Sequence, residues 1–295
     1  MRTRVLSIAA LLVCASASAP AAEPAKTPKV YTIEQFLATE AIGGASFSSD
    51  EKRVLFSSNR TGIYNVYAVP AAGGAAVPLT DSKTDSTYAV SFFPKDDRFL
   101  FTRDQGGNEL NHLYVRLADG TEKDLTPGEK LKARFLGWNR AGDVFYVQTN
   151  ERDARYCDLY RYDAAGYERK LLYQDDKGYD LGAVSDDERL LAFGKANTTA
   201  DSDMYLYDAK TKEMKHLSKH EGLASYDPAD FDPGGKSLYY LTNDGGEFMR
   251  VRRYDVASGK HEDVEKADWD VSFTSFSKNG KYRVTGINED GRTVI

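Results

Sequence analysis

The sequence has 295 residues, enough for one or two ordinary domains, and carries a formal net charge of −6. An acidic surface repels phosphate backbones, and no cluster of Lys and Arg interleaved with aromatic residues offsets it, so nucleic acid is excluded as an expected partner. Tyr (19) and Phe (14) are frequent and Pro (9) is scarce, which suits a β-rich interior because aromatic rings pack well on pleated sheets.

The first 22 residues are expected to be a secretory signal peptide. Arg2 and Arg4 precede a short apolar run, Val5–Val13, and a stretch of small residues follows it. The apolar run is too short to span a membrane, so we expect a periplasmic or secreted protein without a membrane span. Cys14 would carry a lipid anchor in the alternative interpretation, but the bulky Val13 in front of it disfavours lipidation.

Residues 23–44 are expected to form an N-terminal arm and a short helix. The first part of this segment is rich in Ala, Pro and Lys. Thr32 and Gln35 then form a capping box in front of Phe36 and Leu37, which predicts a helix at Ile33–Thr39.

A repeat of about 45 residues occupies the rest of the chain. Each copy begins with a charged turn that leads into short β-forming runs, as in the segment Phe47–Tyr67. The junctions between turn and strand recur at intervals of 45, 45, 46, 48 and 45 residues, at Arg53, Arg98, Asp143, Arg189, Ser237 and Tyr282. An exit dipeptide keeps the same register, at Leu79-Thr80, Leu125-Thr126 and Leu217-Ser218.

Four short strands per unit at this spacing are typical of β-propeller blades. We therefore predict an all-β fold in which residues 45–295 form a β-propeller of four-stranded, WD40-like blades, five of them full and the sixth partial. A β-sandwich with coincidental spacing is the alternative. The predicted blades are Ala45–Thr80, Ala89–Thr126, Phe135–Tyr173, Leu181–Ser218, Phe231–Val264 and a last unit that begins at Val271.

The sequence stops partway through the sixth unit. A propeller closes when its last blade meets its first, so we interpret the chain as part of a truncated seven- or eight-bladed propeller. The alternative is a six-bladed ring closed by strands from residues 23–44, a segment that is predicted instead to be arm and helix.

The sequence predicts no catalytic, cofactor or metal site. Gly44–Ser48 comes nearest to a Gly-x-Ser-x-Gly nucleophile elbow, but it lacks the final glycine and a following helix. His216 and His220 are four residues apart, yet they lie at a predicted strand end and turn, so the convergence that a helix gives such pairs does not apply. Gly106-Gly107 is a turn rather than a phosphate-binding loop.

The loops between the second and third strands of the blades are predicted to share one face, which we call the rim. Loops held on a rigid scaffold are where partners and substrates bind. An ordinary solvated face is the alternative for any single residue. The rim residues that we expect to face a substrate or partner are Arg60, Asp104, Asn108, Glu109, Glu151, Arg152, Asp153, Arg155 and Asp203.

With these repeats in place, the chain resembles the N-terminal propeller of the prolyl oligopeptidase family of serine peptidases (peptidase family S9). The matching segments are Tyr31–Phe36, Phe47–Tyr67, Asp104–Tyr114, Asn150–Asp153 and Thr198–Asp203. The resemblance implies a propeller that caps a C-terminal α/β-hydrolase domain, admits short peptides and excludes folded proteins. That domain would supply a Ser-Asp-His triad and an oxyanion hole, and this chain contains none of those positions.

Two functions follow from these observations. In the first, the chain is the substrate-gating propeller of an exported peptidase, is inactive by itself, and has a peptide substrate and a C-terminal hydrolase domain as partners. In the second, it is a non-enzymatic periplasmic propeller that binds proteins, like that of the Tol system. Dipeptidyl peptidases of the family grip the substrate amino terminus with adjacent glutamates, and this sequence has no Glu-Glu pair.

Overall fold

A computed structural model of the chain describes residues 28–295. The predicted signal peptide lies outside the described residues. Contacts within the chain set the unit Glu40–Ile295 apart from the segment that ends at Thr39, so each is described by itself.

The segment before Glu40 contains the predicted helix, α1 (Ile33–Leu37). Its capping box is present: the backbone N–H of Gln35 donates to the Thr32 hydroxyl, and the Gln35 side chain accepts from the backbone of Thr32. The helix ends at Leu37 rather than at Thr39, because Ala38 already leaves the helical conformation at the C-cap. No helix of the described residues is long and apolar enough to cross a membrane.

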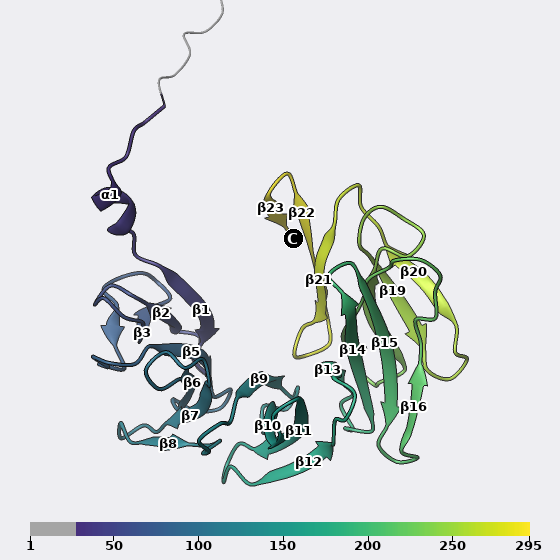
Figure 1. Ribbon diagram of the computed structural model, residues 1–295, viewed down its shortest axis with the longest axis horizontal. Coiled ribbons are helices and arrows are strands. Elements are labelled where there is room, and N and C mark those ends of the chain that lie inside the picture. Colours follow the sequence, from purple (N-terminus) through teal and green to yellow (C-terminus); the bar gives the residue numbers. More distant parts are fainter. Residues whose placement is uncertain (1–27) are drawn as a thin grey trace, which may run out of the picture. The chain divides into compact units, whose positions relative to one another are not determined.

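The unit Glu40–Ile295 is a β-propeller of six antiparallel sheets that follow one another along the chain (Figure 1). In every sheet the strands pair in sequence order. The first three sheets consist of β1 (Ile42–Phe47), β2 (Arg53–Ser58), β3 (Asn65–Pro70) and β4 (Val77–Pro78); β5 (Thr87–Phe92), β6 (Phe99–Arg103), β7 (His112–Arg116) and β8 (Glu122–Asp124); and β9 (Ala133–Trp138), β10 (Val144–Asp153), β11 (Tyr156–Asp163) and β12 (Arg169–Tyr173).

The last three sheets repeat the pattern, except that the sixth has three strands. They consist of β13 (Asp180–Val184), β14 (Leu190–Thr198), β15 (Asp201–Asp208) and β16 (Glu213–His216); β17 (Tyr226–Phe231), β18 (Ser237–Thr242), β19 (Arg250–Asp255) and β20 (His261–Glu265); and β21 (Val271–Phe276), β22 (Arg283–Glu289) and β23 (Arg292–Val294). The predicted all-β propeller with five full blades and a partial sixth is confirmed.

The largest differences from prediction are at the start of the first strand, in the first and fifth blades. β1 begins at Ile42, within the segment expected to be arm and helix, and pairs with β2 of the first blade. Among the described residues no strand of the first sheet pairs with one of the sixth, so strands from this segment do not close a six-bladed ring. The fifth blade begins at Tyr226 rather than Phe231. Pro228 disfavoured a strand at this position in the sequence, but β17 is an edge strand, where a missing backbone N–H is tolerated.

A β-bulge interrupts the pairing between the first and second strands of every blade. Bulges bend a strand and re-aim its side chains. At the bulges Ser46 and Asp230 accept hydrogen bonds from the backbone N–H of Phe92 and Phe276, which belong to the next blade, at 3.0 and 2.8 Å. The bulges therefore present side chains that tie neighbouring blades together.

The exit dipeptides of the repeat have a structural explanation. The hydroxyl after the fourth strand turns inward and accepts a backbone N–H from the third strand of the same blade. The donors are Val66, Leu113 and Met204, at 2.8, 2.8 and 2.7 Å from Thr80, Thr126 and Ser218. All three hydroxyl residues are buried, so each must be satisfied internally.

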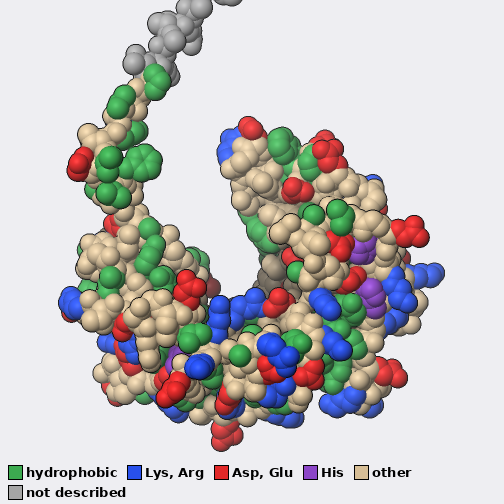
Figure 2. Space-filling view, in the orientation of Figure 1, with side chains coloured by type: hydrophobic (Ala, Val, Ile, Leu, Met, Phe, Trp, Pro, Cys, Tyr) green, Lys and Arg blue, Asp and Glu red, His purple; other side chains and the backbone are tan. Residues whose placement is uncertain are grey.

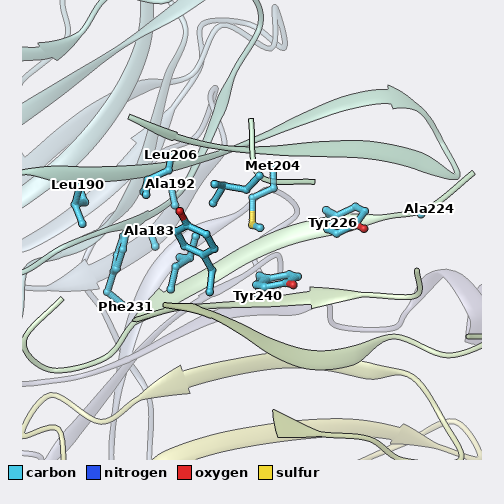
Figure 3. Close-up of a cluster of buried hydrophobic side chains, with 12 residues drawn as sticks. Ala183, Leu190, Ala192, Met204, Leu206, Ala224, Tyr226, Phe231 and Tyr240 are labelled. Carbon is cyan, nitrogen blue, oxygen red and sulfur yellow. The ribbon is translucent and has the colours of Figure 1, made fainter. Parts of the chain in front are cut away.

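The hydrophobic core lies between blades as well as within them. One buried cluster joins the fourth and fifth blades, where the rings of Tyr226 and Tyr240 stack near Met204 with ring centroids 6.1 Å apart (Figure 3). Another joins the second and third blades, where Phe93 packs edge-on against Trp138 at 4.9 Å. Burial of aromatic side chains between sheets thus holds the blades in register.

Candidate functional site

The rim residues were predicted to lie in the loops between the second and third strands. In the third and fourth blades most of them lie on the strands themselves. β10 and β11 continue until only Ala154 and Arg155 remain as a turn, and β14 and β15 continue to Thr198 and from Asp201. The expected loops Asn150–Tyr156 and Ala196–Asp203 are therefore mostly hairpin. Register shifts in both hairpins, together with their polar composition, hid these strand extensions in the sequence.

The side chain of Arg60, in the first blade, forms an ion pair with Glu40. Its guanidinium donates from Nε and Nη2 to the same carboxylate oxygen, at 2.9 and 2.7 Å, and lies over the ring of Tyr67 with 4.8 Å to the centroid. A hydrogen bond from Ser58, followed by those from Arg60, lowers the pKa of Glu40. Arg60 thus fastens the start of the propeller unit.

The second-blade loop between β6 and β7 is organised by its own polar side chains. Asp104 accepts the backbone N–H of Glu109 at 3.0 Å, and Asn108 accepts those of Gln105 and Leu110 at 3.3 and 3.0 Å. Glu109 has a left-handed backbone, with φ of 60°. Its side chain is the one among the predicted rim residues that makes no hydrogen bond or ion pair within the described part of the chain.

In the third blade, the rim residue Arg152 is the centre of an ion-pair network. Arg152 donates to both oxygens of Asp158, at 2.7 and 2.8 Å, to the backbone oxygen of Asp175, and lies 3.1 Å from the carboxylate of Asp176. The side chain of Asp158 is only 2% exposed, and its carboxylate also accepts the backbone N–H of Asp175 at 2.9 Å. Arg152 is the basic side chain that pairs with this buried carboxylate. The hydrogen bond to Asp158 is the largest cause that raises the pKa of Arg152.

Two exposed ion pairs lie beside that network. Glu151 forms a two-point contact with Arg169, at 2.6 and 2.9 Å, and this contact lowers the pKa of Glu151. Arg155 reaches back to Asp153 at 2.8 Å, and its hydrogen bonds lower the pKa of that carboxyl. Exposed pairs of this kind contribute little to stability.

In the fourth blade, Asp203 belongs to a cluster that contains the residue types of a catalytic triad. Asp203 and the hydroxyl of Ser218 both meet Nε2 of His216, at 2.7 and 3.2 Å. A triad requires the carboxylate and the hydroxyl on opposite ring nitrogens. Ser218 is moreover 2% exposed and accepts the backbone N–H of Met204, so it has neither the access nor the geometry of a nucleophile.

Asp203 is held by three donors. Burial acts to raise its pKa, but hydrogen bonds from Asn197, His216 and Ser218 outweigh burial and lower it. The cluster also contains Asp201, two residues earlier on β15 and on the same side of that strand. The spacing of two between Asp201 and Asp203 was the signal in the sequence that would have revealed this cluster.

No group of three or more His, Cys, Asp and Glu side chains in residues 28–295 has a geometry that would hold a metal ion. His216 and His220 each meet a different carboxylate, Asp203 and Asp201. The visible face of the molecule carries acidic and basic side chains interspersed (Figure 2). Most of the charged rim residues are thus paired with an opposite charge within the described residues.

At the ends of the inner strands opposite the rim, a set of contacts between blades is centred on Arg140, in the turn after β9. Its guanidinium donates to Asp186 of the fourth blade at 2.9 Å, to the backbone oxygen of Phe231 of the fifth at 2.8 Å and to that of Ser277 of the sixth at 3.1 Å. Arg140 and Asp186 border a cavity of about 250 Å³. A lone arginine in a turn gave no signal of this role in the sequence.

The fold defines a β-propeller protein. Comparisons with known proteins indicate which family of propellers the chain resembles. No family model matches the chain. The chain is 31% identical over 235 residues to dipeptidyl aminopeptidase BIII of Pseudoxanthomonas mexicana, which covers 77% of this chain and 34% of that protein. The chain thus spans about a third of the length of the curated relative it matches.

Solved structures agree with the fold. A prolyl endopeptidase structure aligns with a TM-score of 0.62 and 17% identity, over 85% of this chain and 40% of the other. A structure described as TolB from Agrobacterium tumefaciens aligns with a TM-score of 0.50 and 16% identity, over 76% of this chain and 80% of the other. With the sequence relationship above, the resemblance to the N-terminal propeller of the prolyl oligopeptidase (S9) family is confirmed.

Proposed function

We propose that this chain is the substrate-gating propeller of an exported S9 serine peptidase that acts on short peptides. The observation that carries the proposal is the 31% identity over 235 residues to a dipeptidyl aminopeptidase. In this role the propeller admits extended peptides to a hydrolase domain and excludes folded proteins, while the hydrolase domain performs the chemistry through an acyl-enzyme.

The site geometry supports a gating role without a catalytic one. Most side chains of the rim are held by intramolecular contacts, such as Arg152 on Asp158 and Arg60 on Glu40, before any partner arrives. Ser218, the hydroxyl that meets a histidine and a carboxylate, is buried and in the wrong geometry to attack a peptide bond. A pre-organised rim loses little conformational entropy on docking.

The first test uses chromogenic dipeptide anilides and a serine-directed fluorophosphonate probe. The 295-residue chain is expected to give no turnover and no labelling, whereas the protein expressed from its gene through the natural stop codon is expected to give both. A Ser218→Ala variant is the matched control. Turnover by the 295-residue chain that disappears in this variant would overturn our assignment of the cluster.

The second test addresses gating. The product of the whole gene is expected to cleave a short peptide and to leave the same sequence uncut when it lies in a loop of a folded protein. The competing function is a non-enzymatic protein-binding propeller, which the similarity to the TolB fold favours. A gene product that binds periplasmic proteins but does not react with fluorophosphonate would establish that competing function.

We also propose a periplasmic or secreted location. The charged start, apolar run and small residues of positions 1–22 support it. Mass spectrometry of the protein recovered from its source is expected to show a mature chain that lacks this segment. A mature protein that retains it would contradict the proposal.

A further inference from the structure

The connection between β16 and β17, residues 217–225, leads from the outermost strand of the fourth blade to the innermost strand of the fifth. His220 lies in this connection, and its side chain is 8% exposed. Its Nδ1 lies 2.6 Å from the backbone oxygen of Ser218, and its Nε2 lies 2.9 Å from a carboxylate oxygen of Asp201 on β15. Both ring nitrogens therefore face oxygens.

A carbonyl and an ionised carboxylate can only accept hydrogen bonds, so each ring nitrogen must donate. A neutral imidazole carries one N–H, and one of the two contacts would then set a nitrogen lone pair against an oxygen. We propose that His220 is a pH-sensitive tie: as an imidazolium it fastens the connection between the fourth and fifth blades to Asp201, and loss of its proton releases that connection.

The charged groups around His220 favour the imidazolium. On β15, Asp203 lies 4.0 Å from Nδ1, in addition to Asp201. On β16, His216 shares the carboxylate of Asp203. On β17, the ring of Tyr226 lies with its centroid 5.3 Å from that of His220 and donates its hydroxyl to Asp244. Lys219 and Glu221 flank His220 in the connection and are exposed.

The pKa directions of the pair agree with this geometry. The hydrogen bond to the Ser218 carbonyl, followed by that to Asp201, raises the pKa of His220 above its usual 6.5. The hydrogen bond from His220 is in turn the largest cause that lowers the pKa of Asp201. A raised pKa in the folded state means that the stabilisation is complete below pH 6.5 and is lost as the pH rises through the folded value.

Release of His220 would reach the junction between blades because Asp201 also holds the end of the connection. Its carboxylate accepts the backbone N–H of Ala224 at 3.3 Å. The next residue on β15, Ser202, exchanges hydrogen bonds with Tyr226 at 2.8 and 2.9 Å. Ala224 and Tyr226 both belong to the buried cluster between the fourth and fifth blades. The switch therefore acts beside Asp203, on the rim that we propose to face the substrate or partner.

His261 in the fifth blade serves as an internal control, because its pKa is shifted in the direction opposite to that of His220. Its Nδ1 lies 2.8 Å from the Tyr240 hydroxyl, which can act as donor, and no carboxylate is within hydrogen-bond distance in the described residues. Burial, followed by the charges of Arg252 and Lys215, lowers its pKa. His261 should thus lose its proton before His220 as the pH rises.

The test follows the ring nitrogens of isotopically labelled histidine by NMR in the whole chain, from about pH 5 to about pH 9. His220 is expected to be more than half charged at pH 6.5, with both nitrogens protonated, and Asp201→Asn is expected to lower its pKa by about one unit or more. Hydrogen exchange of residues 217–226, corrected for intrinsic base catalysis, is expected to speed up across the same pH range. That rise is expected to vanish in His220→Gln and to persist in His261→Gln.

Titration of His220 at or below pH 6.5, or one protonated nitrogen at that pH, would overturn the proposal. So would an exchange profile that is the same in the wild type and in His220→Gln. If His220→Gln does not fold, the titration of the wild-type chain still decides, because it needs no variant.

Discussion

The two ends of the inner strands differ in how many blades their charged side chains join. At the turn end, Arg140 alone reaches three other blades and binds backbone oxygens of two of them. At the rim, Arg152 pairs with Asp158 and Glu151 with Arg169 inside the third blade, and Arg134 at the start of β9 pairs with Asp180 of the next blade alone. One residue therefore joins four blades at the turn end, whereas the contacts at the rim end join at most two neighbouring blades, as in Ser202 with Tyr226.

The largest effect is expected where a rim charge is buried within one blade. Arg152→Met should cause the largest loss in the free energy of unfolding, because the carboxylate of Asp158, 2% exposed, would keep only the backbone N–H of Asp175 and lose its basic partner. Urea denaturation measures the loss, and hydrogen exchange should place it in the third blade. Arg155→Met, at a side chain that is 74% exposed, is the control and should leave the free energy of unfolding nearly unchanged. Equal losses in both variants would refute the distinction.

A smaller but more widespread effect is expected at the turn end. Arg140→Met should cost about 2–3 kcal/mol, since it removes donors from two backbone oxygens and a partner from partly buried Asp230. Hydrogen exchange should increase at the ends of β17 and β21, in blades other than the one mutated. Exchange that rises only in the third blade would show that Arg140 does not join the blades.

The exit hydroxyls should matter less than either arginine. Thr126→Val keeps the volume but removes the acceptor of the Leu113 backbone N–H in a fully buried place, at a cost of about 1–2 kcal/mol. Thr211→Val, at an exposed turn, is the matched control and should be nearly neutral. Thermal unfolding compares the two, and an unchanged or raised melting temperature for Thr126→Val would contradict this role.

The exposed rim pair should contribute least. Glu151 and Arg169 are each 38% exposed, so Glu151→Gln should cost less than about 1 kcal/mol, and the cost should shrink in high salt. Because the pKa of Glu151 is lowered from 4.5, the contribution of the pair should be present above that pH and disappear as the pH falls through the folded value. Denaturation curves at two salt concentrations measure it. A large cost that does not depend on salt would mean that the pair acts as a buried one.

The sequence predicted the blades well because their signals are local. A charged turn, alternating apolar runs and a Thr or Ser at the exit recur with each blade, and each has a contact that explains it, such as Thr80 with Val66. It predicted the first strands less well, because bulges and Pro228 break the alternation of β17. The position of the rim could be derived from topology, but the partners of Arg140 and His220 could not, since those contacts join residues from separate strands or blades.

The central claim is that this propeller serves a serine hydrolase domain of the S9 family. The most direct measurement is the sequence of the natural transcript beyond codon 295, read together with fluorophosphonate labelling of its protein product. We predict an in-frame Gly-x-Ser-x-Gly whose serine is labelled. A transcript with no such motif and a product that is not labelled would contradict the claim.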